Sequence, residues 1–263
     1  MTVVLQVSDT HFGTERPMAM AALERLVAAL TPDLLLVTGD ITQRARPAEF
    51  ARARAFVDKL GVPARLVIPG NHDIPLFAVF NRLLNPYGRY VRAFGEALEG
   101  EFERDDLLLM AINTTRWYRH THGEVSAAQI DRVARRLEAA RPGQWRMVAV
   151  HQPVAVTKAS DLENLLRGHE AAVRRWADAG VDAVIGGHIH LPYVLPLRAR
   201  WPTLAHPVWA VQAGTALSTR VRGGIPNSVN VIRTGPGRGA VVERWDVDET
   251  VGTFQQITAT TLG

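Results

Sequence analysis

The chain of 263 residues contains no cysteine. Disulfide bonds and thiolate metal sites are therefore excluded, and any bound metal must be held by nitrogen and oxygen ligands. A protein without cysteine fits the reducing cytoplasm, which is where we expect this one. No segment approaches the ~20 consecutive apolar residues that span a bilayer, so we expect no membrane span. The apolar start, 1–7, is too short for a signal peptide and has no basic region, so we expect a first strand there.

Lysine is almost absent as well, occurring only at Lys59 and Lys158. The net charge of +4 therefore comes from arginines, which are scattered along the chain rather than gathered in a basic run. Aromatic residues make up 7% of the sequence and do not alternate with a basic stripe. Proteins that bind nucleic-acid polymers usually show one or both patterns, so we expect no such partner here.

Short apolar runs alternate with amphipathic stretches over the first two thirds of the chain. The runs are rich in Val, Leu and Ile and are stopped by polar residues or glycine, as buried strands are. The predicted strands are Val3–Val7, Leu34–Thr38, Arg65–Pro69, Leu107–Asn113, Arg146–Val150 and Ala183–Gly186. Apolar residues at helical spacing predict helices between them, the last running from Leu162 to Trp176.

The last quarter of the chain changes character, because glycine- and proline-rich turns rather than helices separate its apolar runs. Four further strands are predicted there, at 208–213, 228–233, 240–246 and 252–260. The pattern predicts an α/β fold with antiparallel strands at the C-terminal end. We expect one domain over 1–263, of which 207–263 is the β-rich part, and two mixed β-sheets that pack on each other between flanking helices.

Five of the predicted strands end in a polar cluster. The clusters are Ser8-Asp9-Thr10-His11, Gly39-Asp40, Gly70-Asn71-His72-Asp73, His151-Gln152-Pro153 and Gly187-His188-Ile189-His190. In open α/β sheets the ligand crevice lies outside the carboxyl ends of the strands, so these five positions would converge on one site. His, Asp and Asn side chains suit divalent Mn, Fe, Zn or Co.

Taken singly, each cluster has a plainer explanation. A lone Asp-x-His or His-x-His pair is common at surfaces, and Asn and Asp favour glycine-flanked turns. Chance would have to place all five at strand ends, however. The candidate metal ligands are Asp9, His11, Asp40, Asn71, His151, His188 and His190. They are too many for one tetrahedral site but suit two ions if one carboxylate bridges, and Asp40, alone after its strand, is the predicted bridge.

The five clusters, in this order, resemble the motifs of the calcineurin-like metallophosphoesterases. That family carries Asp-x-His, Gly-Asp, Gly-Asn-His-Asp/Glu, a later His and Gly-His-x-His, and all five are present here between Asp9 and His190. The opening Val-Ser-Asp-Thr-His-Phe-Gly is most similar to the bacterial class III cyclic-nucleotide phosphodiesterase branch. One difference is Gln152, where relatives often carry another His. The family fold, two packed sheets flanked by helices, agrees with the pattern of strands and helices.

The resemblance also implies a site and a reaction. Asp9, His11, Asp40 and His190 would hold the first of two divalent ions, and Asp40, Asn71, His151 and His188 the second. A hydroxide that bridges the ions would attack the phosphorus of a small phosphate ester. His72 would bind no metal but face the scissile phosphate as a catalytic acid, and Asp73 would orient it.

The substrate stays open at this point. A phosphodiesterase with 3',5'-cyclic AMP as its leading substrate competes with a broad phosphomonoesterase or phosphodiesterase that acts on glycerophosphodiesters, nucleotides or lipid-linked phosphates. A lipid substrate would require an exposed apolar patch, and none is obvious. A non-catalytic scaffold would be expected to have lost ligands, and here every cluster is intact. We read His120 and His122 as loop residues that shape the pocket mouth. Arg89 could contact a phosphate, but we read its segment as a structural loop, and the C-terminal strands could build a homodimer.

Overall fold

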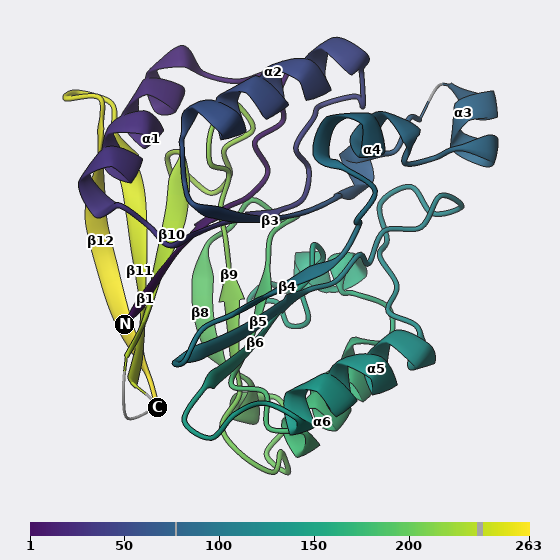
Figure 1. Ribbon diagram of the computed structural model, residues 1–263, viewed down its shortest axis with the longest axis vertical. Helices are drawn as coiled ribbons and strands as arrows, with labels where there is room; N and C mark the ends of the chain where they lie inside the picture. The colour runs from purple at the N-terminus through teal and green to yellow at the C-terminus, as the bar shows by residue number, and fades with distance from the viewer. Residues whose placement is uncertain (77, 236–238) are drawn as a thin grey trace.

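Two six-stranded sheets pack face to face in the computed structural model, which describes residues 1–76, 78–235 and 239–263 (Figure 1). The first sheet has the order β12-β11-β10-β1-β2-β3, in which the strands are β1 (Thr2–Val7), β2 (Leu34–Thr38), β3 (Ala64–Ile68), β10 (Ser228–Gly235), β11 (Gly239–Asp248) and β12 (Thr253–Leu262). The second has the order β4-β5-β6-β7-β9-β8, in which the strands are β4 (Gly100–Glu103), β5 (Leu107–Ala111), β6 (Trp145–Ala149), β7 (Ala183–Gly186), β8 (Tyr193–Pro196) and β9 (Trp209–Gln212).

Helices cover the outer face of each sheet. α1 (Pro17–Leu30) and α2 (Pro47–Lys59) lie over the first sheet, while α5 (Ala127–Glu138) and α6 (His169–Asp178) lie over the second (Figure 1). Two short helices, α3 (Val79–Leu84) and α4 (Gly88–Phe94), follow β3. This arrangement confirms the predicted fold of two packed mixed sheets flanked by helices.

The apolar strands are buried on both faces, which explains their unbroken hydrophobic runs. Successive side chains of a strand point to opposite faces. Leu34 and Leu36 of β2 accordingly join the core between the sheets, while Leu35 and Val37 pack under α1 and α2. β5 alternates in the same way between the inter-sheet core and the core under α5 and α6.

The C-terminal strands complete the first sheet rather than adding a separate layer. β10 pairs antiparallel with β1, with Leu5 opposite Val231, and β11 and β12 continue outward from it. Asp106, in the turn between β4 and β5 of the second sheet, accepts hydrogen bonds from Thr2 of β1 and Thr234 of β10. This one carboxylate therefore ties the two sheets together.

Three local expectations were wrong. The predicted helix from Leu162 begins at His169, because residues 159–164 form a 3₁₀ turn in which Leu162 is exposed. The segment around Arg89, expected to be a loop, forms α4, in which Arg89 donates to the backbone oxygen of Ala45. The edge strands β4 and β8 were missed, since β4 alternates between uncharged and charged residues and β8 is a four-residue segment that follows one proline and ends in another.

Among the described residues, no helix is both long enough and apolar enough to cross a membrane.

Candidate metal centre

The seven candidate ligands meet at one edge of the paired sheets. β1, β2 and β3 run parallel in the first sheet, and β6 and β7 run parallel in the second. Each of these strands ends just before one of the polar clusters, so the clusters face one another across the gap between the sheets. The seven residues are Asp9, His11, Asp40, Asn71, His151, His188 and His190, and the structure brings all of them together.

Hydrogen bonds fix which ring nitrogen of two histidines faces the centre. His151 Nδ1 lies 2.7 Å from the backbone oxygen of Thr38, and His190 Nδ1 lies 2.7 Å from that of Arg220. A carbonyl oxygen only accepts, so both Nδ1 atoms donate, and in the neutral rings Nε2 is left as an acceptor. Imidazoles that bind metals are commonly held in this way by a second hydrogen bond.

These acceptor nitrogens face other acceptors. His151 Nε2 lies 3.3 Å from Asp40 Oδ1 and 3.2 Å from Asn71 Oδ1. His190 Nε2 lies 3.2 Å from Asp9 Oδ1 and 3.0 Å from His11 Nε2. Acceptors converging at such distances repel one another unless a proton or a cation lies between them. The donor set of nitrogen and oxygen atoms fits divalent cations.

The centre is also buried. Asp9, His11 and His151 are fully buried, and Asp40 and Asn71 nearly so. Asp9 Oδ2 accepts from Ser8 Oγ at 2.6 Å and from the backbone N–H of His188 at 3.0 Å, whereas Asp9 Oδ1 has no well-aligned donor among the described residues. His188 Nδ1 likewise lacks a described partner. Buried polar atoms are rarely left unsatisfied, so these orphaned atoms are further evidence for cations at this centre.

The side chains divide into two groups of converging ligand atoms. Asp9, His11, Asp40 and His190 form one group, and Asp40, His151 and His188 form the other. Asn71 joins the second group through its contact with His151. Asp40 belongs to both groups, the position that a bridging carboxylate would occupy.

The pKa values of the ligand side chains follow from burial and from the facing charges. Burial alone would raise the pKa of Asp9, but His190 and His151 lower it to about 2. Burial lowers the pKa of His11 and of His188 to about 3, so both rings are neutral at pH 7 and able to bind a cation. Burial would also lower the pKa of His151, but the facing carboxylate of Asp40 raises it to about 9. A metal must displace that proton.

The backbone is strained at this centre. Asp9, His11, Asp40, His188 and His190 all have positive φ, between 42° and 74°. Such conformations cost about 1–3 kcal/mol per non-glycine residue and cluster at functional sites. Two glycines make room for the ligands: a Cβ on Gly39, whose φ is +93°, would overlap the ring of His151, and one on Gly187 would overlap Ser8 and Asp9.

His72 lies beside the two groups, and its ring is held by residues that the motifs do not include. Its Nδ1 donates to the backbone oxygen of Gln43 at 2.8 Å, and its Nε2 lies 3.2 Å from Arg220 Nη1. Arg220 Nη1 also donates to Gln43 Oε1 at 3.3 Å. Sequence reasoning missed both Gln43 and Arg220, because a lone residue in an irregular segment forms no pattern.

Asp73 and Gln152, which adjoin candidate site residues in the sequence, both make structural contacts. The expectation that Asp73 orients His72 was wrong: its carboxylate accepts from the backbone N–H groups of Gly70, Ile41 and Thr42. Asp73 therefore fixes the loops that carry Asp40 and Asn71, and burial together with the charge of Asp40 raises its pKa to about 6. Gln152 is fully buried, accepts from Thr114 Oγ1 and donates to the backbone oxygen of Thr121, so it supports the 114–121 loop at both ends.

A cavity of about 240 Å³ opens beside the centre. Its lining consists of Gln43, Arg44, Asn71, His72, Ile74, Leu76 and His120. His120 thus lies at the pocket, in the loop expected there, while Arg89 is directed to Ala45 instead.

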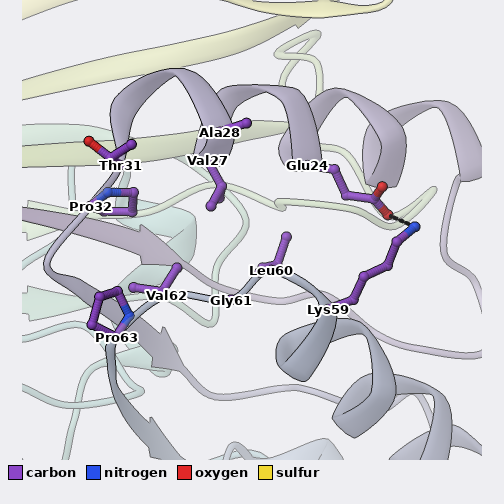
Figure 2. A pocket seen from close by; sticks show the side chains of 10 residues that line it. All are labelled: Glu24, Val27, Ala28, Thr31, Pro32, Lys59, Leu60, Gly61, Val62 and Pro63. Atoms are coloured by element: carbon purple, nitrogen blue, oxygen red, sulfur yellow. Dashed lines mark hydrogen bonds and ion pairs between the residues drawn. The ribbon is translucent and has the colours of Figure 1, made fainter.

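A larger pocket, of about 440 Å³, lies between the C-terminal ends of α1 and α2 (Figure 2). Its lining contains no histidine, and its charged side chains, Lys59 and Glu24, pair with each other at 2.8 Å. α1 and α2 lead into the starts of β2 and β3, so this pocket is at the opposite edge of the sheet from the ligand cluster. It has none of the chemistry of the metal centre.

Residues 2–192 match the family model described as calcineurin-like phosphoesterase. The chain is 27% identical over 214 residues to a cAMP/cGMP dual specificity phosphodiesterase of Mycobacterium tuberculosis, a match that covers 72% of this chain and 61% of that protein. It is 30% identical over 161 residues to a 3',5'-cyclic adenosine monophosphate phosphodiesterase of Haemophilus influenzae, covering 60% and 54%. The chain thus spans between about one half and three fifths of the length of these relatives.

Solved structures share the fold at low sequence identity. A purple acid phosphatase from yellow lupin has a TM-score of 0.74 at 13% identity, and the match covers 99% of this chain and 53% of that one. A dimetal phosphatase from Danio rerio has a TM-score of 0.71 at 14% identity, covering 99% and 98%.

Proposed function

The chain belongs to the calcineurin-like phosphoesterase family, and on that premise we propose that it is a two-metal phosphodiesterase that hydrolyses a small phosphodiester, with 3',5'-cyclic AMP as the leading substrate. The observation that carries this proposal is the pair of converging ligand groups that share Asp40. The cyclic-nucleotide phosphodiesterases among the relatives support the choice of substrate.

The residues fit two divalent ions. In this proposal Asp9, His11, Asp40 and His190 hold the first, and Asp40, Asn71, His151 and His188 hold the second. Two bound ions supply Lewis-acid stabilisation of phosphoryl oxygens and lower the pKa of water, which is the chemistry that ester hydrolysis at neutral pH requires. The protein contributes a rigid cage, because Thr38 and Arg220 hold the imidazoles and Ser8 holds Asp9.

In this proposal His72 and Arg220 act on the substrate itself, beside the ions. Arg220 directs a guanidinium group towards the ring of His72, and a guanidinium matches two phosphate oxygens at once. His72 Nδ1 is occupied by Gln43, so only Nε2 can give a proton to a leaving oxygen, and it must carry that proton while Arg220 contacts the phosphate in place of the ring. We assign Arg220 to the phosphate and His72 to the leaving group. A cytoplasmic location and a homodimer stay predictions.

The test is hydrolysis by purified protein loaded with Mn²⁺, with and without a chelator. The panel contains cyclic AMP, cyclic GMP, bis(p-nitrophenyl) phosphate as a linear diester and p-nitrophenyl phosphate as a monoester. We expect chelator-sensitive turnover that favours the diesters, with cyclic AMP among the substrates. Faster turnover of the monoester would favour a phosphomonoesterase, and no metal-dependent turnover at all would identify a non-catalytic scaffold.

A further inference from the structure

Large apolar side chains are exposed beside the candidate site. In α3 the side chain of Phe80 is 80% exposed and that of Leu84 is 84% exposed, and Leu83 between them is also exposed. Trp117 and Tyr118, in the loop after β5, are exposed too. The expectation that the protein has no obvious apolar patch was therefore wrong. Three of these side chains come from a helix too short to produce a periodic signal in the sequence.

The two segments that carry these side chains lie side by side. Arg82 Nη2 in α3 donates to the backbone oxygen of Arg119 at 2.9 Å, and Tyr87 Oη lies 3.0 Å from the backbone oxygen of Thr115. Figure 1 shows α3 standing out from the body of the protein next to α4. We call the exposed side chains of Phe80, Leu83, Leu84, Trp117 and Tyr118 the apolar rim. Leu76, just before α3, lines the cavity that also contains His72, so the rim borders the mouth of that cavity.

The two stretches of chain that carry the apolar rim contain positively charged but no negatively charged residues. Residues 74–95 and 112–123 contain no Asp or Glu but five arginines, at positions 82, 89, 92, 116 and 119. Arg119 pairs with Glu124, just after the second segment, at 2.8 Å, and Arg89 donates to the backbone oxygen of Ala45, so the excess of positive charge rests on the other three. Over the whole chain, 30 basic residues are nearly balanced by 26 acidic ones, so this imbalance is local. Exposed aromatic and aliphatic side chains among arginines are typical of proteins that lie on a lipid surface. There the rings enter the headgroup region and the guanidinium groups meet anionic lipids.

We propose that the apolar rim docks this protein on the surface of an anionic lipid bilayer, with the mouth of the cavity beside the headgroups. A second copy of the chain fits the rim less well. A two-fold dimer through this patch would bring the same surface of each copy together, and so arginines against arginines, while Glu124, the carboxylate next in sequence to the second segment, is already paired with Arg119. The docking is peripheral and is independent of the proposed hydrolysis.

The experiment is co-sedimentation of the full chain with vesicles of phosphatidylcholine alone or with roughly one third phosphatidylglycerol. We expect binding to the anionic vesicles only, weakened by high salt because charge contributes. The double variant Phe80→Ser/Leu84→Ser should bind about a hundredfold more weakly, since two large apolar side chains no longer enter the interface. Val251→Ser/Ile257→Ser is the matched control: it removes two exposed apolar side chains, 61% and 51% exposed, from the β11–β12 turn and β12, and it should bind like the wild type.

Hydrolysis of bis(p-nitrophenyl) phosphate in the absence of vesicles should be equal in the wild type and in both variants, which separates docking from catalysis. The proposal is overturned if the wild type ignores anionic vesicles, or if Phe80→Ser/Leu84→Ser binds them as well as the wild type. Equal loss in the control pair also overturns it. A wild-type dimer that Phe80→Ser/Leu84→Ser converts to a monomer, with no vesicle binding, would assign the rim to self-association instead.

Discussion

Arg220 is the residue at which support of the metal centre and contact with the substrate can best be tested apart. Its backbone oxygen accepts from His190 Nδ1 at 2.7 Å, while its guanidinium lies beside His72 and Gln43. The change Arg220→Ala removes the second function and leaves the first, because the carbonyl stays. We therefore expect both ions to be retained and the rate to fall.

The size of that fall follows from the lost charge-assisted hydrogen bonds. Such a bond contributes about 1.5–3 kcal/mol, which corresponds to roughly a 10- to 150-fold loss in kcat/KM. The effect should lie mainly in kcat if the contact strengthens as charge develops on the phosphoryl oxygens. Arg220→Lys keeps the charge but not the planar fork, so its rate should be intermediate.

Steady-state kinetics on bis(p-nitrophenyl) phosphate, together with metal content by elemental analysis, measure both effects. Arg174→Ala is the matched control, because Arg174 is a surface arginine of α6 that pairs with Glu170. A wild-type kcat/KM in Arg220→Ala would refute the phosphate assignment. Loss of metal in the same variant would show that the guanidinium, and not the carbonyl, maintains the cage.

Three further predictions concern the acid, the cage and the link between the sheets. The His72→Ala variant should keep its metal and lose more activity on cyclic AMP than on p-nitrophenyl esters, because the p-nitrophenolate leaving group needs no proton. Equal losses of activity on both substrates would refute the role of His72 as an acid. Gly39→Ala should lower the free energy of unfolding by about 1–3 kcal/mol and weaken metal binding, because its Cβ overlaps His151 in a backbone of positive φ; thermal melting with and without Mn²⁺ measures this, and an unchanged melting temperature and affinity would contradict the packing. Asp106→Asn should cost about 1–2 kcal/mol. Although burial opposes it, hydrogen bonds from Thr2 and Thr234 lower the pKa of Asp106, so its contribution is present above the unfolded pKa and is lost as pH falls through the folded one. Denaturant unfolding at pH 7 and pH 3 should show the variant converging on the wild type in acid, and a constant difference would refute this linkage.

The sequence predicts much of the fold because the central strands are buried on both faces. β2 and β5 show this as continuous apolar runs. The edge strands show a weaker signal: β4 alternates between uncharged and charged residues, and β8 is an apolar run of only four residues that ends in a proline. α3 and α4 are too short for helical periodicity to appear.

In the candidate site, likewise, residues that follow a sequence pattern could be predicted, whereas residues placed only by tertiary contacts could not. All seven ligands follow strands whose ends are fixed by the sheet, so their convergence was predictable. Gln43 and Arg220 reach His72 from irregular segments, and their positions depend on tertiary packing. Asp73 was assigned to the wrong partner because sequence proximity to His72 says nothing about direction, and the carboxylate points to backbone N–H groups after β2.

The central claim is that one carboxylate, Asp40, holds two ions at once. Its most direct test is the metal content of protein loaded with Mn²⁺ and then desalted, measured by elemental analysis for the wild type and for Asp40→Ala. The two converging groups predict two equivalents in the wild type and the loss of both in Asp40→Ala, because each group contains that residue. An Asp40→Ala variant that retains both ions, or a correctly folded wild type that holds none, would contradict the account.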